Sequence, residues 1–572
     1  MDNSRPGPSG LKKKRKGAAV SNVVKKNIKK SKTVQSSKRN TTSLDDSQSE
    51  DDFDIPHISD GSGSSSDEED FALNPIDFEE DKYGYTSVVF GREDLRVRDD
   101  PPFLGGRRAA IPLTLGKEPI QFFELFLSND ILNTIVTETN RYARDFFNKA
   151  TTRAWMTRYP TSRLHQWPAD GVTIQDIRQY LGLLINMGVN SKTGAVADFW
   201  TTRPSQTTPY YSSVMSVNLF LLIHRFLHLN DTGAELEKDN ENYDPWVKVR
   251  VFLDAVNGAS KRYYSPSQHV SIDESMIGMK NRCAYIQYMP NKRHARFGIK
   301  KFQLCDDNGF VIHINLYAGK DIELHGEEGD GQAVTVVKNL LHEASLYNRG
   351  HRVYTDNFYT KPKLADYLTA RNTILVGTVR ANSKDIPEAA KTALAVGEAR
   401  FWRRGDLLFC AFREKKTQTK PVLLLSTGHN ATKITLNRRN KPIEKPTLIH
   451  DYNLHMGGVD ISDKMVCHYA SERATRRYWK KIFQNLLDVS LLNAFLLYEN
   501  TPGTTKMKRK LFIITIVESL CLQHPTPPPL PPPPTALLHQ LVLLGGRKEM
   551  QCAVCSKRPK GNQIYQTLCR KL

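Results

Sequence analysis

The sequence predicts an α/β fold: a mixed sheet covered by helices and carrying a β-rich insertion, with a mainly α-helical domain and a disordered N-terminal tail. Three observations lead to this prediction. Apolar residues recur at helical spacing from about residue 112 to 260, strand-like and helix-like runs alternate from about 268 to 380, and blocks of like charge fill the first 85 residues.

The composition favours a nucleic-acid partner. The chain of 572 residues has 81 Lys and Arg against 61 Asp and Glu, a net charge of +20 and a pI near 9.4. Such a surplus favours nucleic acid or an anionic membrane surface. No apolar run reaches the length of about 18 residues typical of a membrane span, and a secretory signal is missing, so we expect no membrane partner. The 8 cysteines are scattered except near the end, which fits a reducing compartment.

Residues 1–105 are expected to form a disordered tail that is first basic and then acidic. Lysine-rich runs at 12–16 and 25–32 precede SLDDSQSEDDFD and SGSSSDEEDF. Low hydrophobicity and blocks of like charge cannot offset the entropy cost of ordering. The basic runs predict import into the nucleus, although a tail that touches DNA non-specifically has the same composition.

Residues 106–262 are predicted to form the mainly helical domain. Ser128 and Asn129 are candidate caps for a helix over 131–147, whose apolar residues recur every three or four positions. Thr173 and Asp176 resemble a capping box before a helix over 177–189. Amphipathic runs at 216–231 and 245–257 predict two further helices.

Residues 263–380 are predicted to form the first part of the α/β core. Runs at 269–276 and 298–319 indicate strands, and the second contains Asp-Asp-Asn-Gly, which is typical of a β-hairpin turn. Helices at 333–347 and 361–372 alternate with strands at 351–359 and 373–380, which indicates a mixed sheet. Residues 381–450 are predicted to be a β-rich insertion, and residues 451–500 to complete the core.

The C-terminal part departs from a globular pattern. Residues 501–546 are predicted to be a Pro-rich linker, because HPTPPPLPPPPT favours the extended polyproline II conformation. Residues 547–572 form a short cysteine-rich tail in which Cys552, Cys555 and Cys569 are candidate zinc ligands. A structural zinc site takes four ligands, so a fourth would have to come from a distant His or from another subunit.

Three widely separated aspartates are candidate metal ligands. Asp273 in HVSIDESM and Asp356 in RVYTDNFYT each interrupt or end an apolar strand, where an unpartnered charge is uncommon. Asp460 follows a Gly-Gly pair at the start of a helical stretch, and Asp463 lies three residues further on. Carboxylate oxygens that converge on Mg²⁺ are typical of phosphodiester chemistry. The alternative is that each aspartate caps a helix or ends its strand.

At these residues the chain resembles the piggyBac transposase family. The resemblance spans most of residues 119–500 and rests on ETNRYA, DFW, IDES, MPNKRHARFGIK, YTDNFYT and MGGVDISDKM. It implies an RNase H-like catalytic core, a helical domain for dimerisation and DNA binding, and Mg²⁺ or Mn²⁺ as cofactor. The family's three catalytic, metal-binding aspartates fall on Asp273, Asp356 and Asp460, and Asp463 matches a further acidic position.

The resemblance also implies a function: a nuclear, homodimeric transposase that acts on double-stranded DNA and on no small molecule. Such an enzyme excises DNA through hairpin ends and inserts it at TTAA targets by metal-dependent phosphoryl transfer. The short cysteine-rich tail departs from the family, whose members usually end in a zinc-binding domain that helps to recognise transposon ends. The chain could instead be a transposase-derived DNA-binding protein without full transposition activity, or a stand-alone RNase H-type nuclease.

Basic, polar and aromatic residues near the aspartates are candidate DNA contacts. Each phosphate contact releases counterions, and an aromatic ring beside a basic patch can stack on an unpaired base. For any single Lys or Arg, the alternative is a solvated surface charge. The candidates are Lys292, Arg293, Arg296, Lys300, Lys301, Asn357, Arg476, Arg477, Trp479 and Lys480.

Overall fold

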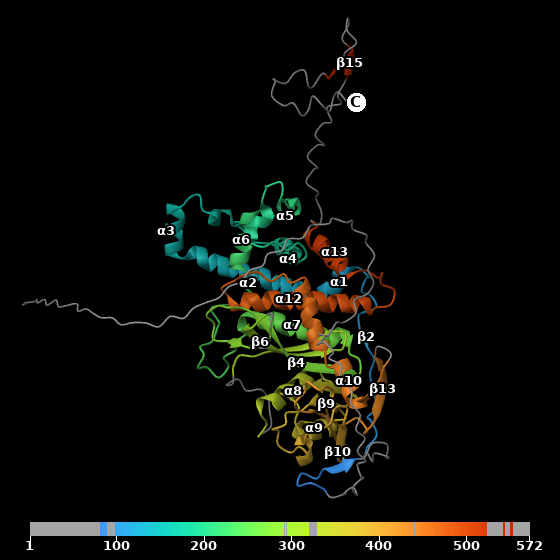
Figure 1. The fold of residues 1–572 in the computed structure, drawn as a ribbon. Helices are drawn as coiled ribbons and strands as arrows, with labels where there is room; N and C mark the ends of the chain where they lie inside the picture. Colours follow the sequence, from blue (N-terminus) through green and yellow to red (C-terminus); the bar gives the residue numbers. More distant parts are fainter. Residues whose placement is uncertain are drawn as a thin grey trace, which may run out of the picture. The chain divides into compact units, whose positions relative to one another are not determined.

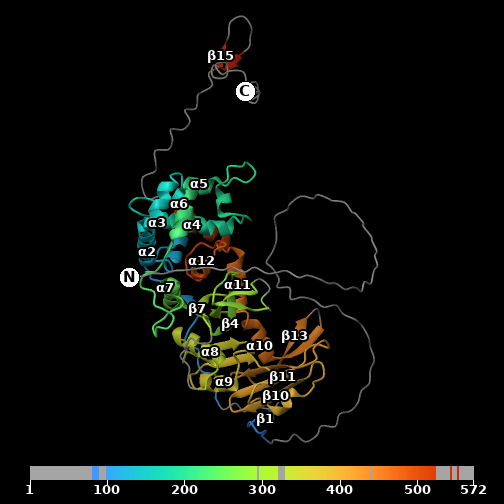
Figure 2. The same cartoon turned by 90° about the vertical axis from the view of Figure 1, so that its left-hand side faces the viewer.

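The computed structural model describes residues 80–88, 98–290, 292, 295–319, 329–438, 441–522, 541–543 and 550–552. A layer of helices and a mixed ten-stranded sheet make up most of this part of the chain (Figures 1 and 2). Most of the predicted tail, the Pro-rich run and two of the three candidate zinc ligands lie outside the described residues. Beyond residue 522 the structure describes only the hairpin of β15 (Leu541–Leu543) and β16 (Met550–Cys552).

The helical layer confirms the helices predicted before residue 262. Ser128 caps the second of them by accepting a hydrogen bond from the backbone N–H of Ile131, and Thr173 and Asp176 form the predicted capping box. The layer comprises α1 (Pro119–Glu124), α2 (Asn129–Asn148), α3 (Ala150–Arg158), α4 (Ile174–Val189), α5 (Pro209–Val214), α6 (Val217–Phe226), α7 (Val247–Tyr263) and, from the end of the chain, α13 (Arg509–Cys521).

The long helix α12 (Tyr478–Glu499) joins the helical layer to the rest of the fold. It packs against α1, α7 and α13 of the helical layer (Figure 1), and it also contacts β4 (His269–Gly278) and a helix that lies on the sheet. Nearly every residue from Trp479 to Tyr498 is buried, because this helix is largely apolar and has neighbours all round. None of the described helices is both long and apolar enough to cross a membrane.

The core of the sheet centres on β4 (His269–Gly278). This strand is antiparallel to β6 (Phe297–Asp306) and parallel to β8 (Arg352–Thr355), which is in turn parallel to β9 (Ile374–Thr378). β5 (Ile286–Tyr288) and β7 (Val311–Leu316) both pair with β6, and β6 and β7 form the hairpin that the Asp-Asp-Asn-Gly turn predicts. Gly309 in this turn has a φ of 86°, a conformation that favours glycine.

The insertion adds three of its described strands to this same sheet, and a fourth comes from the segment 1–105 that was predicted to be disordered. β12 (Val422–Ser426) pairs with β9, and β11 (Leu407–Phe412), β10 (Ala399–Arg404) and β1 (Thr86–Val88) follow in antiparallel order. The hairpin of β13 (Lys433–Arg438) and β14 (Lys441–Pro446) is separate, as is the small pair β2 (Arg108–Ala109) and β3 (Tyr264–Ser265). The core and the insertion therefore share one continuous ladder of backbone hydrogen bonds.

Besides α7, which contacts β7, and α12, which contacts β4, four further helices in the described part of the chain pack on the sheet. α8 (Gln332–Glu343) packs on β6 and β7, and α9 (Pro362–Thr369) on β9 and β11. α10 (Thr447–His455) and α11 (Gly458–His468) follow each other in the chain, and both contact β4. The mixed sheet covered by helices confirms the predicted fold class.

Candidate active site

Two of the three predicted aspartates lie side by side on neighbouring parallel strands. In the register of β4 with β8, Ile272 pairs with Thr355. Asp273 follows Ile272 within β4, and Asp356 is the first residue after β8. Neighbouring strands lie about 4.8 Å apart, and paired residues of parallel strands point to the same face. The sheet therefore brings together two carboxylates that are far apart in the sequence.

The surroundings of these two carboxylates disfavour their negative charge. Burial raises the pKa of Asp273 to about 7; Glu274 and Asp356 raise it further, and Lys292 opposes the shift. Burial likewise raises the pKa of Asp356, and Glu274 adds to the effect. The excess of negative charge fits a hard divalent cation, since Mg²⁺ and Mn²⁺ prefer carboxylate oxygens as ligands.

The helix that carries the third aspartate, α11, lies on the same face of β4. Ser271 and Ser275 alternate with apolar residues and so point to the face of Asp273. A Cβ on Gly458, at the start of α11, would lie 2.6 Å from Oγ of Ser271 and 2.5 Å from the carbonyl oxygen of Asp306. Only glycine at position 458 allows the helix to approach the sheet so closely, which explains the second glycine of the pair before Asp460.

One turn after Asp460, Asp463 is anchored to the sheet. Its Oδ1 accepts a hydrogen bond of 2.6 Å from Oγ of Ser275. Burial raises the pKa of the Asp463 carboxyl and Asp460 contributes to the increase, while Lys301, Ser275 and Lys292 lower it. The Asp460 side chain itself is exposed.

The three aspartates do not close into a tight ligand cluster in this structure. Among the described residues, the group of three metal-type side chains whose ligand atoms all lie within 4.8 Å of one another is His269, Asp451 and His455. Folding thus brings Asp273 and Asp356 close together and packs α11 on the same face of β4, while the side chain of Asp460 stays exposed.

Several of the predicted DNA contacts surround the carboxylates. Nζ of Lys292 donates a hydrogen bond of 2.8 Å to the carbonyl oxygen of Glu274, and Nζ of Lys300 lies 4.0 Å from Oε2 of Glu274. Asn357 is exposed beside Asp356 and accepts a hydrogen bond of 2.9 Å from Nε of Arg380. Arg296 and Arg476 are at least partly exposed, and Arg293 lies outside the described residues.

Trp479 and Lys480 were predicted to contact DNA, but both side chains are buried, with exposed fractions of 4% and 3%. Nζ of Lys480 donates to the carbonyl oxygens of His224 and Arg225 at the C-terminal end of α6, a position that favours a cation. The guanidinium of Arg477 lies over the ring of Tyr142. The start of α12 thus packs against the helical layer, and neither the indole of Trp479 nor the ammonium of Lys480 is accessible to DNA.

Lys301, another predicted DNA contact, is buried as well. It is 1% exposed, pairs with Ser275 in the register of β4 with β6, and donates a hydrogen bond of 2.8 Å to Oδ1 of Asn485. Its charge lowers the pKa of Asp463. Successive side chains of a strand point to opposite faces, so strand alternation could have distinguished the buried Lys301 from its neighbour Lys300.

Sequence reasoning set Glu274 aside, because its side chain points to the face of the strand opposite Asp273. Its Oε2 accepts a hydrogen bond of 3.2 Å from the hydroxyl of Tyr359, and its charge raises the pKa of both Asp273 and Asp356. Alternation places its side chain opposite that of Asp273, and only the folded structure shows that the two charges still interact.

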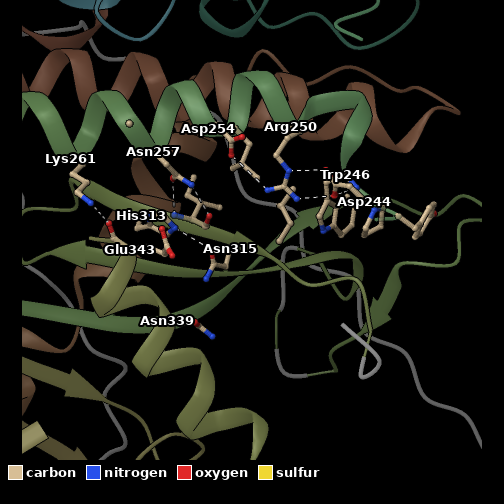
Figure 3. A pocket seen from close by; sticks show the side chains of 16 residues that line it. Asp244, Trp246, Arg250, Asp254, Asn257, Lys261, His313, Asn315, Asn339 and Glu343 are labelled. Atoms are coloured by element: carbon tan, nitrogen blue, oxygen red, sulfur yellow. Dashed lines mark hydrogen bonds and ion pairs between the residues drawn. The ribbon is translucent and has the colours of Figure 1, made fainter. Parts of the chain in front are cut away.

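A cavity of about 660 Å³ lies away from these carboxylates, between α7, β7 and α8 (Figure 3). Its cationic side chains already have partners: Arg250 pairs with Asp244, and Lys261 donates to the carbonyl oxygen of Glu343. Asn257 exchanges two hydrogen bonds of 3.0 Å with the backbone of Ile314. None of the predicted site residues lines this cavity.

Comparison with known proteins decides the family. The family model described as Transposase IS4 matches residues 118–495, well over half of the chain. The cryo-EM structure of a piggyBac transposase synaptic complex with hairpin DNA is similar at 25% identity with a TM-score of 0.62, over 73% of this chain and 82% of that chain. The chain belongs to the piggyBac-type transposase family.

Human relatives of this transposase-family chain are named as proteins derived from piggyBac transposable elements. PiggyBac transposable element-derived protein 3 of Homo sapiens is 24% identical over 550 residues, 87% of this chain and 85% of the relative. PiggyBac transposable element-derived protein 2 of Homo sapiens is 23% identical over 464 residues, covering 76% and 71%. The matched family region contains Asp273, Asp356, Asp460 and Asp463, whereas the three candidate zinc cysteines lie beyond it.

Proposed function

We propose that this transposase-family chain is an active DNA transposase whose catalytic residues are Asp273, Asp356 and Asp460, with Asp463 in support. The observation that carries the proposal is the position of Asp273 on β4 beside the end of the parallel strand β8, which Asp356 directly follows, with α11 packed on the same face of β4. The four carboxylates would hold Mg²⁺ or Mn²⁺.

When bound, the divalent ions would supply Lewis-acid stabilisation of the attacking and leaving oxygens of a phosphodiester. The protein's part is to hold the carboxylates on rigid elements and to attract the DNA backbone. Ser275 and Lys301 position Asp463 from β4 and β6. Lys292 and Lys300 offer positive charge to phosphate beside the carboxylates.

The finer steps of the proposal follow the family. Excision through hairpin ends and insertion at TTAA by cut and paste are supported by the likeness to a piggyBac transposase synaptic complex with hairpin DNA. A homodimer is supported by the need to hold two DNA ends at once, and a nuclear location by the basic runs near the N-terminus. Zinc bound by Cys552, Cys555 and Cys569 remains a prediction, because the side chains of these cysteines are outside the described part of the chain.

A second candidate function is a transposase-derived DNA-binding protein that no longer moves DNA. The names of the human relatives, which call them derived from transposable elements, favour it. The two functions share DNA binding and differ in strand cleavage.

An excision assay separates them. A plasmid carrying end DNA from genomic copies of the same element is incubated with the purified chain and Mg²⁺ or Mn²⁺, and nicked and hairpin products are resolved on denaturing gels. We expect cleavage by the unmodified chain, and a loss of at least about 100-fold in Asp273→Asn. The exposed Asp239→Asn serves as the matched control.

DNA binding without cleavage under all metal conditions would refute the transposase and support the second candidate. Cleavage that survives Asp273→Asn would refute the assignment of the site. Cleavage of unrelated DNA or of an RNA–DNA hybrid, without joining, would instead identify a nuclease.

A further inference from the structure

Three residues outside the carboxylate site form a compact group of nitrogen and oxygen ligands. His269, Asp451 and His455 each offer a ligand atom, and these atoms all lie within 4.8 Å of one another. His269 is the first residue of β4, and Asp451 and His455 lie one turn apart on α10. Spacing of four residues places two side chains on the same face of a helix, and here that face meets β4.

Hydrogen bonds fix which atoms of His269 and Asp451 are free. The hydroxyl of Tyr354 donates to Oδ2 of Asp451 at 2.7 Å, so its oxygen accepts the proton of His269 Nδ1 at 2.8 Å. Nε2 of His269 is then left with its lone pair. Nε2 of His429 also lies 3.1 Å from Oδ2 of Asp451, so Oδ1 is the oxygen that remains available.

His455 completes the group. Its Nε2 lies 3.5 Å from Oδ1 of Asp451, and its buried Nδ1 has no hydrogen-bond partner among the described residues and lies 3.8 Å from Oδ2 of Asp307. A carboxylate behind the second nitrogen is the usual environment of a metal-binding histidine. The rings of His269 and His455 stack with centroids 3.7 Å and planes 11° apart, so one imidazole must turn out of the stack for both lone pairs to reach the same ion.

We propose that His269, Asp451 and His455 bind a transition-metal dication such as Zn²⁺ or Co²⁺, with water in the fourth position. Two imidazoles and one carboxylate favour such ions over Mg²⁺, which prefers oxygen ligands alone. Burial lowers the pKa of both histidines, that of His269 to about 4, so the imidazoles are neutral, as metal ligands must be, near pH 7.

Nearby arginine side chains are already paired with other carboxylates. Arg352 pairs with Asp100 at 2.5 Å, and Arg107 pairs with Asp306 and Asp307. The negative charge of Asp451 is therefore available to a dication.

The ion would tie the start of β4 to α10, and α10 leads directly into α11 with Asp460. His269 precedes Asp273 by four residues, or about 13 Å along a strand, so the ion is distinct from those proposed for the carboxylates. The site would act as a structural clamp that positions α11 on the sheet. Metal binding is measured without DNA, so the inference stands apart from the proposed function.

The test is a Co²⁺ titration of the full chain followed by visible absorption. We expect one bound equivalent with the d–d bands of a four-coordinate site and no thiolate charge-transfer band. His269→Gln and His455→Gln each lose this equivalent, whereas Asp273→Asn and His313→Gln, a buried histidine elsewhere in the sheet, retain it. Cys552→Ser with Cys555→Ser retains it too.

Loss of the bands in the cysteine variant, or their persistence in both histidine variants, would overturn the proposal, as would no band in the unmodified chain. Should the histidine variants fail to fold, X-ray absorption at the cobalt edge of the unmodified protein decides the question. Two imidazoles among nitrogen and oxygen ligands support the site, and fewer than two refute it.

Discussion

Oγ of Ser275 donates a hydrogen bond of 2.6 Å to Oδ1 of Asp463, and this contact joins β4 to α11 beside Asp273. Hydrogen bonds to charged groups contribute about 1.5–3 kcal/mol. We expect Ser275→Ala to lower the free energy of unfolding by about this amount and to slow DNA cleavage by roughly tenfold, because Asp463 and Asp460 share one helix. Urea denaturation and the excision assay measure the two effects.

Ser271 provides the matched control for that substitution. It lies on the same face of β4, and its buried Oγ has no hydrogen-bond partner among the described residues. Removing an unsatisfied hydroxyl is nearly neutral or stabilising, so Ser271→Ala should leave both readouts close to those of the unmodified chain. Equal losses in the two variants would show that the Ser275–Asp463 bond has no special role.

Two helical glycines should respond to alanine in opposite directions. Gly458→Ala would place a methyl group against Ser271 and the backbone of Asp306, pushing α11 from the sheet, and a displacement of about 1 Å costs roughly 100-fold in rate. Gly258 in α7 is exposed, and a Cβ added there would meet nothing within 4 Å, so Gly258→Ala should add about 0.5–1 kcal/mol of stability. Thermal unfolding and cleavage rates check both, and an active Gly458→Ala variant would contradict the close packing of α11.

Salt dependence of DNA binding should distinguish Arg476 from Lys480. Arg476 is exposed, so Arg476→Gln is expected to reduce the slope of log K against log salt by about 0.9 if it contacts one phosphate. Lys480 is buried against the end of α6, so Lys480→Gln should lower the melting temperature and leave the slope unchanged. A reduced slope in Lys480→Gln would restore it as a DNA contact.

The buried Asp488 on α12 should make stability depend on pH. Its carboxyl accepts two bonds of 3.0 and 3.1 Å from the backbone N–H of Ser471, yet burial raises its pKa well above the ordinary value of 3.8. Between 3.8 and the raised pKa the folded state binds more protons than the unfolded state, so stability falls as the pH rises. Asp488→Asn should remove this fall, giving a gain in melting temperature at pH 7 that disappears near pH 3. The exposed Asp239→Asn should show no such trend.

The sequence predicted the parts of this fold that local patterns encode. Capping of α2 and α4, the β6–β7 hairpin, the strand that contains Asp273 and the strand that Asp356 follows could all be predicted from spacing and residue type. Burial around α12 did not follow, because a basic and aromatic run looks the same whether it faces DNA or a neighbouring helix. The group of His269, Asp451 and His455 left no local signal either, since strand and helix meet only in the folded chain.

The shared ladder of β9 and β12 has a consequence for any attempt to shorten the protein. Removing residues 399–426 would remove β12 from one side of β9. A row of unpaired backbone donors and acceptors on β9 would then face solvent. Such a row recruits strands from other copies, so a minimal core made in this way would self-associate. The strands of the insertion thus cover the edge of the strands that lie beside Asp273 and Asp356.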